Sequence, residues 1–212
     1  DHECGGMSMG FAGTKYSTFF DVLAFQKDSY LGFGEKFSAY KKTHPAGKAA
    51  FDEVVPMIKE SFGLMMPADP ELPAIRKRGE AGDRQAKARL SLVLTPHEVK
   101  VLQTAFAHSM QGEGKRSRND YTYLMYGGYD PLTVKLTQTL NQKAGLAWTS
   151  YSHTGVPVPV SAIGVAAATF NGYYDNTHLG RKIMAAMGVR PKAEAVPAPK
   201  PVKLQPKPAP PK

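Results

Sequence analysis

A candidate set of zinc ligands consists of Asp1, His2 and His153, whose side chains are of types that bind zinc. Zinc in proteins takes imidazole nitrogen and carboxylate oxygen as ligands, so the three make a plausible ligand set. Asp1 and His2 are adjacent at the start of the chain, whereas His153 lies far along it, on a tight turn between two strand-like runs. Because no short metal-binding motif joins these two parts, spacing alone does not predict the site.

Three segments together carry a resemblance to a known family. The first, residues 1–7, reads Asp-His-Glu-Cys-Gly-Gly-Met, and the second, residues 148–155, ends in His153-Thr154-Gly155. The third, residues 170–177, reads Phe-Asn-Gly-Tyr-Tyr-Asp-Asn-Thr and opens an expected final helix. In this order the segments resemble motifs of the C-terminal part of alkaline phosphatases.

The resemblance covers residues 1–20 and 93–189, fits 21–92 only loosely and does not include 190–212. It implies an α/β fold, a three-layer α/β/α sandwich with a mostly parallel sheet flanked by helices. It also implies that the fold is incomplete without an N-terminal portion. Family members carry a serine nucleophile, an Asp-x-x-x-His pair and a phosphate-gripping arginine N-terminal to the Asp-His segment.

The implied reaction is zinc-dependent hydrolysis of phosphate monoesters through a phosphoserine intermediate. By resemblance, Asp1 and His2 bind the zinc that activates the serine. His153 binds a second zinc, which accepts the leaving oxygen and then activates water. No catalytic nucleophile is expected in this chain, and the ligands of a magnesium ion are expected outside it. The chain alone is therefore expected to be inactive and to supply only the C-terminal metal ligands.

The expected partners are the N-terminal part of the same enzyme, a phosphate-ester substrate and further copies in a homo-oligomer. Family members are typically exported, so the resemblance implies a periplasmic, cell-surface or secreted protein. One alternative is a non-catalytic structural or cell-surface component attached through its Pro/Lys tail. Another is a phosphodiesterase or sulfatase-like member of the same superfamily.

Composition adds limits to these expectations. The chain has 212 residues, 42% hydrophobic residues and a formal net charge of +9. A basic balance attracts anions, but lysine and arginine do not alternate with aromatic residues as in a nucleic-acid groove, so no nucleic-acid partner is expected. No apolar run reaches the roughly 18 residues of a membrane-spanning helix. The single cysteine, Cys4, excludes an internal disulfide.

Residues next to the predicted ligands have other expected roles. Glu3 is not expected to be a third ligand, and Cys4 is expected to be structural. Thr154 and Gly155 are expected to orient His153 rather than contact substrate. Gly5 and Gly6 allow close approach of the backbone, which is useful beside a metal site.

Apolar periodicity, capping residues and strand-favouring composition predict the helices and strands that position these residues. Apolar periodicity predicts helices over 34–42 and 48–62. Thr95 and Glu98 form a capping box, Asp130-Pro131 begins a further helix, and Asn176 or Thr177 caps the last one. Two strands are expected on either side of His153, over 146–152 and 158–165.

We expect three divisions of the chain. Residues 1–189 form the C-terminal portion of an alkaline-phosphatase-like domain, in which the mixed-charge segment 66–92 is an insertion. Residues 190–212 alternate proline with lysine and form an extended tail.

Overall fold

The computed structural model describes the chain except for residues 1, 46, 112–119 and 190–212. The chain divides into two units, Asp1–Pro157 and Val158–Lys212. The predicted tail over 190–212 therefore lies outside the described residues. In the part of the chain that is described, no helix combines the length and apolar character needed to cross a bilayer.

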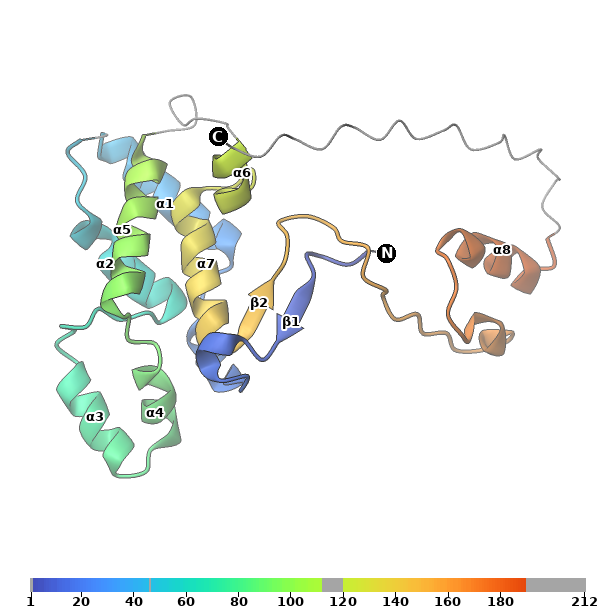
Figure 1. Cartoon of the computed structure of the whole chain (residues 1–212), viewed down its shortest axis with the longest axis horizontal. Helices are drawn as coiled ribbons and strands as arrows, with labels where there is room; N and C mark the ends of the chain where they lie inside the picture. Colours follow the sequence, from blue (N-terminus) through green and yellow to red (C-terminus); the bar gives the residue numbers. More distant parts are fainter. Residues whose placement is uncertain (1, 46, 112–119, 190–212) are drawn as a thin grey trace, which may run out of the picture. The chain divides into compact units, whose positions relative to one another are not determined.

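The first unit consists of helices and one small sheet (Figure 1). In chain order its elements are β1 (Met7–Met9), η1 (Ala12–Thr14), η2 (Phe20–Phe25), α1 (Tyr30–Thr43), α2 (Phe51–Phe62), α3 (Leu72–Glu80), α4 (Arg84–Leu90), α5 (Pro96–Met110), α6 (Asp120–Tyr126), α7 (Pro131–Lys143) and β2 (Leu146–Trp148).

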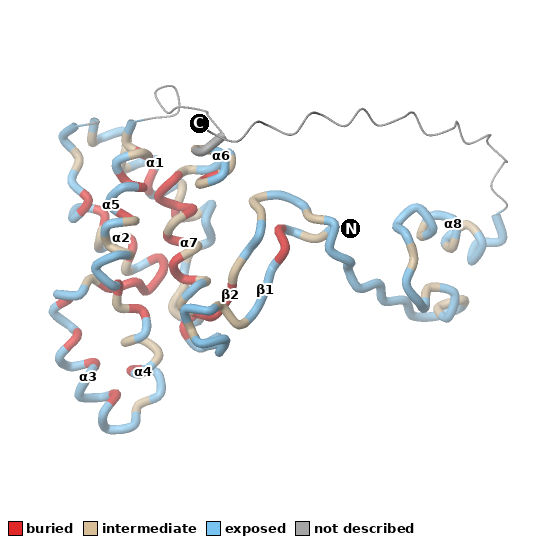
Figure 2. The backbone as a smooth tube through the Cα atoms, in the orientation of Figure 1, coloured by how far each residue is buried: buried red, intermediate tan, exposed pale blue. Residues whose placement is uncertain are grey.

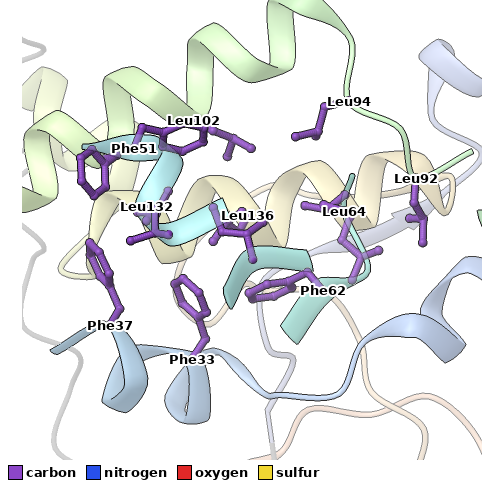
Figure 3. Packing of buried hydrophobic residues seen from close by; sticks show 14 of the residues in the cluster. Phe33, Phe37, Phe51, Phe62, Leu64, Leu92, Leu94, Leu102, Leu132 and Leu136 are labelled. Carbon is purple, nitrogen blue, oxygen red and sulfur yellow. The ribbon is translucent and has the colours of Figure 1, made fainter. Parts of the chain in front are cut away.

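Helix α7 is the central element of this unit, since it contacts α1, α2, α5, α6 and β2. Its leucines recur every four residues, at Leu132, Leu136 and Leu140, and all three are buried. Phenylalanines from the neighbouring helices, including Phe33, pack around this stripe (Figure 3). Figure 2 shows the buried residues concentrated on the facing sides of these helices. Burial of this apolar surface is the main force that holds the unit together.

Two predicted helix starts are confirmed by their hydrogen bonds. The Thr95 hydroxyl accepts from the Glu98 amide at 3.2 Å, and the Glu98 carboxylate accepts from the Thr95 amide at 2.7 Å. The Asp130 carboxylate accepts from the amides of Leu132 and Thr133 at the start of α7. These side chains satisfy amides that have no partner inside the helix.

The bounds of two other helices differ from the predicted ones. α1 begins at Tyr30 rather than at residue 34, because the Ser29 hydroxyl accepts from the Gly32 amide and caps an additional turn. α2 begins at Phe51 rather than at residue 48, and it ends as predicted at Phe62, followed by Gly63 as its C-cap with a φ of 70°. Only glycine adopts that left-handed conformation without steric cost.

Segment 66–92 forms a helical hairpin of α3 and α4 with its own apolar cluster. Its two ends are joined where Met65 pairs with Val93 in an isolated parallel bridge. The Met65 amide donates to the Leu92 carbonyl at 3.1 Å, and the Leu94 amide donates to the Met65 carbonyl at 2.8 Å. A segment that leaves and returns at one point is compatible with an insertion, which stays a prediction.

The sheet differs from the mostly parallel sheet of the expected three-layer sandwich. Among the described residues it has two strands, β1 and β2, which pair antiparallel with Met7 opposite Trp148. β2 ends at Trp148 rather than Ser152, because the amides of Thr149 and Ser150 both turn to the Gly5 carbonyl, at 3.0 and 3.1 Å. The sandwich is therefore not confirmed.

In the second unit, residues 158–165 form no strand, although their composition favours one. A strand forms only where its backbone groups pair with a neighbour, and no described strand pairs with this segment. Its described residues, 158–189, include none that is buried. The unit contains η3 (Ala167–Phe170), which contacts α8 (Thr177–Ala186).

The predicted start of α8 is confirmed in its position, whereas its capping hydrogen bond comes from a different residue. Asn176 occupies the N-cap position but its side chain makes no capping bond. Instead, the carboxylate of Asp175 accepts from the amide and the hydroxyl of Thr177, at 2.9 and 2.7 Å. Aspartate can satisfy a free helix amide as well as asparagine can, so sequence pattern alone does not separate the two.

Candidate metal centre

His2 and His153 lie side by side, although nearly the whole first unit separates them in the sequence. Their rings are stacked, with 3.4 Å between the ring centroids and 26° between the ring planes. Both residues are exposed. The structure therefore brings together the two predicted imidazole ligands, while Asp1 lies outside the described residues. That these residues bind zinc stays a prediction.

Backbone hydrogen bonds hold the two histidine-bearing segments against one another. Beyond the pairing of β1 with β2, the Gly5 carbonyl accepts from two successive amides, those of Thr149 and Ser150. The Thr149 hydroxyl donates to the Gly6 carbonyl at 3.1 Å. The segment after His2 is therefore fixed to the segment before His153 by groups that do not depend on either imidazole.

Glu3 adds a side-chain connection between the same segments. Its carboxylate accepts from the amides of Gly5 and Gly6, at 2.7 and 2.6 Å. It also accepts a short hydrogen bond from the hydroxyl of Thr154, the residue after His153. The sequence indicated that Thr154 orients His153, and the structure identifies Glu3 as the group that holds Thr154. No sequence signal identifies this pair, because nothing local relates residues so far apart.

The hydrogen bonds of Glu3 predict how its contribution to folding stability depends on pH. Donation from Thr154 and from the Gly5 and Gly6 amides lowers the pKa of Glu3 from 4.5 to about 2. Between these values the unfolded state binds more protons than the folded state, so this contribution to stability rises with pH. It is fully present above the unfolded pKa and is lost as pH falls through the folded pKa.

We expect the amide proton shifts of Gly5 and Gly6 to titrate with a midpoint near pH 2. The measurement is an NMR titration of this chain and of Glu3→Gln, in which the transition should be absent. A midpoint at the ordinary glutamate value would contradict the Glu3–Thr154 contact.

Gly5 and Gly6 are buried where the two segments meet. Gly6 has a φ of +68°, and a Cβ there would lie 2.9 Å from the Thr149 hydroxyl oxygen. A Cβ on Gly5 would lie 3.0 Å from the Ser150 carbonyl oxygen. The backbones therefore approach to a distance that leaves little room for a side chain, as the glycine pattern predicted.

Replacing Gly6 by alanine is expected to loosen the contact between the segments. A left-handed conformation costs a non-glycine residue about 1–2 kcal/mol, so the Thr149 and Ser150 amides should exchange hydrogen about 5–30 times faster. Gly128→Ala is the matched control, because a Cβ there meets nothing within 4 Å and no positive φ is required. Equal exchange rates in the two variants would show that Gly6 does not hold the contact.

The described residues fit zinc as part of a ligand set. Neutral imidazole nitrogens are suitable donors, and the Nδ1 of His2 lies 3.0 Å from the Glu3 carbonyl oxygen. Such a carbonyl contact fixes the tautomer of a metal-binding histidine and leaves Nε2 as the donor atom. Glu3 itself is occupied by its three hydrogen bonds, and the Cys4 sulfur lies 3.9 Å from the His2 carbonyl.

Within the part of the chain that the structure describes, no three His, Cys, Asp or Glu residues are grouped closely enough to hold a metal. A tetrahedral zinc site needs about four ligands. His2 and His153, each as a ligand of a different zinc ion, would therefore need further ligands from Asp1 and from groups outside the described residues.

Comparison with known families supports the later part of the predicted resemblance. Residues 129–189 match the family model described as Alkaline phosphatase. The match begins just before α7 and includes β2, His153 and α8, and it leaves out the Asp1-His2 segment. The chain thus contains a region, residues 129–189, that is similar to part of alkaline phosphatases. Neither a curated protein nor a solved structure matches the chain.

Proposed function

We propose that this chain supplies the C-terminal metal ligands of a zinc-dependent phosphomonoesterase. The observation that carries the proposal is the stacking of His2 on His153. The second of these histidines lies within the region that matches alkaline phosphatases. The family generally uses zinc and magnesium. In the proposal, Asp1 and His2 hold one zinc and His153 holds another.

Zinc ions held by these residues would polarise a nucleophile and would stabilise charge on the leaving oxygen. The residues of this chain hold and orient the ligands. The Glu3 carbonyl directs the His2 ring, and the Glu3 carboxylate fixes Thr154 next to His153. Since Thr154 is attached directly to His153, a hydrogen bond to its side chain limits movement of the His153 backbone.

The serine nucleophile, the phosphate-binding arginine and the magnesium ligands would come from an N-terminal part of the enzyme. That part would also complete the three-layer fold. Ile163 and Val165 are fully exposed in this structure, at 101% and 99%. β-Branched residues favour strands, so segment 158–165 has the composition of a strand whose neighbours lie in another part of the protein. The family is commonly periplasmic or secreted, and we propose an exported homo-oligomer.

The test compares this chain with the complete enzyme, meaning this chain together with the proposed N-terminal part. The complete enzyme should hydrolyse a phosphate monoester, lose activity with a chelator and recover it with zinc. Residues 1–212 alone should be inactive. Full activity of residues 1–212 would contradict the proposed division of the site. A complete protein with neither zinc nor activity would favour a non-catalytic component attached through its Pro/Lys tail.

A further inference from the structure

A cavity of about 420 Å³ lies next to the segments that carry His2 and His153. Cys4, Ser150 and Tyr151 contribute to its lining, and each is two or three residues from one of these histidines. The opposite side of the cavity is formed by α7 and by residues of α1 and α6. Four aromatic side chains line the cavity, namely Tyr30, Tyr129, Trp148 and Tyr151.

One of the aromatic side chains, Tyr151, is held in place by two hydrogen bonds, and ring contacts join Tyr129 to Tyr30 and to Tyr151. The Tyr151 hydroxyl donates to the Met125 carbonyl at 2.5 Å and accepts from the Gln138 side-chain amide at 2.9 Å. The Tyr129 ring lies edge-on to Tyr30, with 5.9 Å between centroids, and 6.5 Å from the Tyr151 ring. A preorganised wall of this kind reduces the entropy lost when a ligand binds.

Among the described residues, none that lines the cavity is Asp, Glu, Lys, Arg or His, although the chain has a net charge of +9. Its polar groups are amides, hydroxyls and one thiol, among them Gln138 and Asn141. Aromatic faces and apolar side chains with a few neutral polar groups favour a flat, uncharged aromatic ring. A phosphate group is charged and would not be stabilised inside this cavity.

We infer that the cavity holds the aromatic ring of the alcohol in a phosphate monoester whose phosphate lies at the His2–His153 end. The substrate class is then the phosphate esters of aromatic alcohols. This inference rests on the proposed function, because it assumes that the ester is cleaved beside the two histidines. The observation that places the cavity beside the histidines is that Cys4, Ser150 and Tyr151, which line it, lie two or three residues from His2 or His153 in the sequence.

Kinetics of the complete enzyme test the substrate class. Benzyl phosphate and ethyl phosphate have leaving alcohols of similar acidity, so a preference for the benzyl ester reports binding of the ring. We expect kcat/KM to favour benzyl phosphate by about tenfold, which corresponds to about 1.4 kcal/mol. Tyr129→Ala and, separately, Leu124→Ala should reduce this preference. Tyr123→Ala is the control, because Tyr123 is an exposed tyrosine on α6 that does not line the cavity.

Fluorescence provides a test that does not depend on hydrolysis. Trp148 lines the cavity and is the only tryptophan of the chain. Titration of residues 1–212 with 2-naphthol should change its emission saturably, and Tyr129→Ala should weaken the apparent affinity by about tenfold. Circular dichroism of each variant checks that the fold is retained.

The two tests separate the inference from the function on which it rests. Hydrolysis of both esters without preference, together with no saturable change at Trp148, would overturn the inference and leave the phosphatase proposal intact. A saturable change at Trp148 without hydrolysis of any ester would contradict the phosphatase proposal. The substrate assignment would then fall too, and the cavity would remain an aromatic-binding site.

Discussion

His153→Ala is expected to reduce phosphate-ester hydrolysis by the complete enzyme by a factor on the order of a thousand or more. A catalytic metal contributes several kcal/mol of charge stabilisation in the transition state, and each 1.4 kcal/mol is about tenfold in rate. His153 is the proposed ligand of the zinc at the leaving oxygen. Its replacement should therefore remove one zinc ion per site, measured by metal analysis alongside kcat/KM.

His178→Ala is the matched control for this prediction. His178 is exposed and lies in the first turn of α8, within the same matched region as His153. It has no proposed metal role, so zinc content and rate should be unchanged. Equal effects of the two substitutions, or no effect of His153→Ala, would contradict the assignment of His153.

Leu136→Ala is expected to lower the free energy of unfolding by about 2–5 kcal/mol. Leu136 is 0% exposed and lies in the middle of α7, the helix that most other elements contact. Removing its side chain takes away buried apolar surface and leaves a cavity that rigid helices on several sides cannot fill. The change is measured by urea unfolding of the whole chain, followed by circular dichroism.

Leu124→Ala makes the same chemical change at a site that is 74% exposed. We expect its effect on unfolding to stay within about 0.5 kcal/mol, as for surface substitutions generally. If Leu136→Ala and Leu124→Ala lowered the free energy of unfolding equally, α7 would not be the centre of the core.

Helices could be predicted from the sequence because their signals are local. Thr95 and Glu98, or Asp130 and Pro131, lie within one turn of each other, so the residues that determine a cap are read together. The predicted start of α1 and the predicted cap of α8 were less accurate. Ser29 caps α1 five residues before the predicted start at residue 34, and Asp175 rather than Asn176 accepts from the Thr177 amide at the start of α8.

The candidate site could be predicted only in part. The proximity of His2 and His153 followed from a family resemblance, since their spacing carries no signal. The contact of Glu3 with Thr154 joins residues 151 positions apart, so it depends on how the whole first unit folds. The cavity beside Trp148 likewise combines residues from α1, α6, α7 and the segments at both ends of the unit.

The sheet shows why strands were harder to predict than helices. A helix satisfies its own backbone groups, whereas a strand needs a partner that lies elsewhere in the sequence. Segment 146–152 has strand composition throughout, yet β2 ends where Thr149 turns to Gly5. Segment 158–165 has the same character and finds no partner among the described strands.

Anomalous diffraction at the zinc absorption edge, from crystals of the complete enzyme, tests the central claim most directly. We predict two zinc peaks about 3.5–4 Å apart, one within about 2.1 Å of an imidazole nitrogen of His2 and the other equally close to His153. Crystals soaked in zinc that show no peak near either histidine would contradict the account.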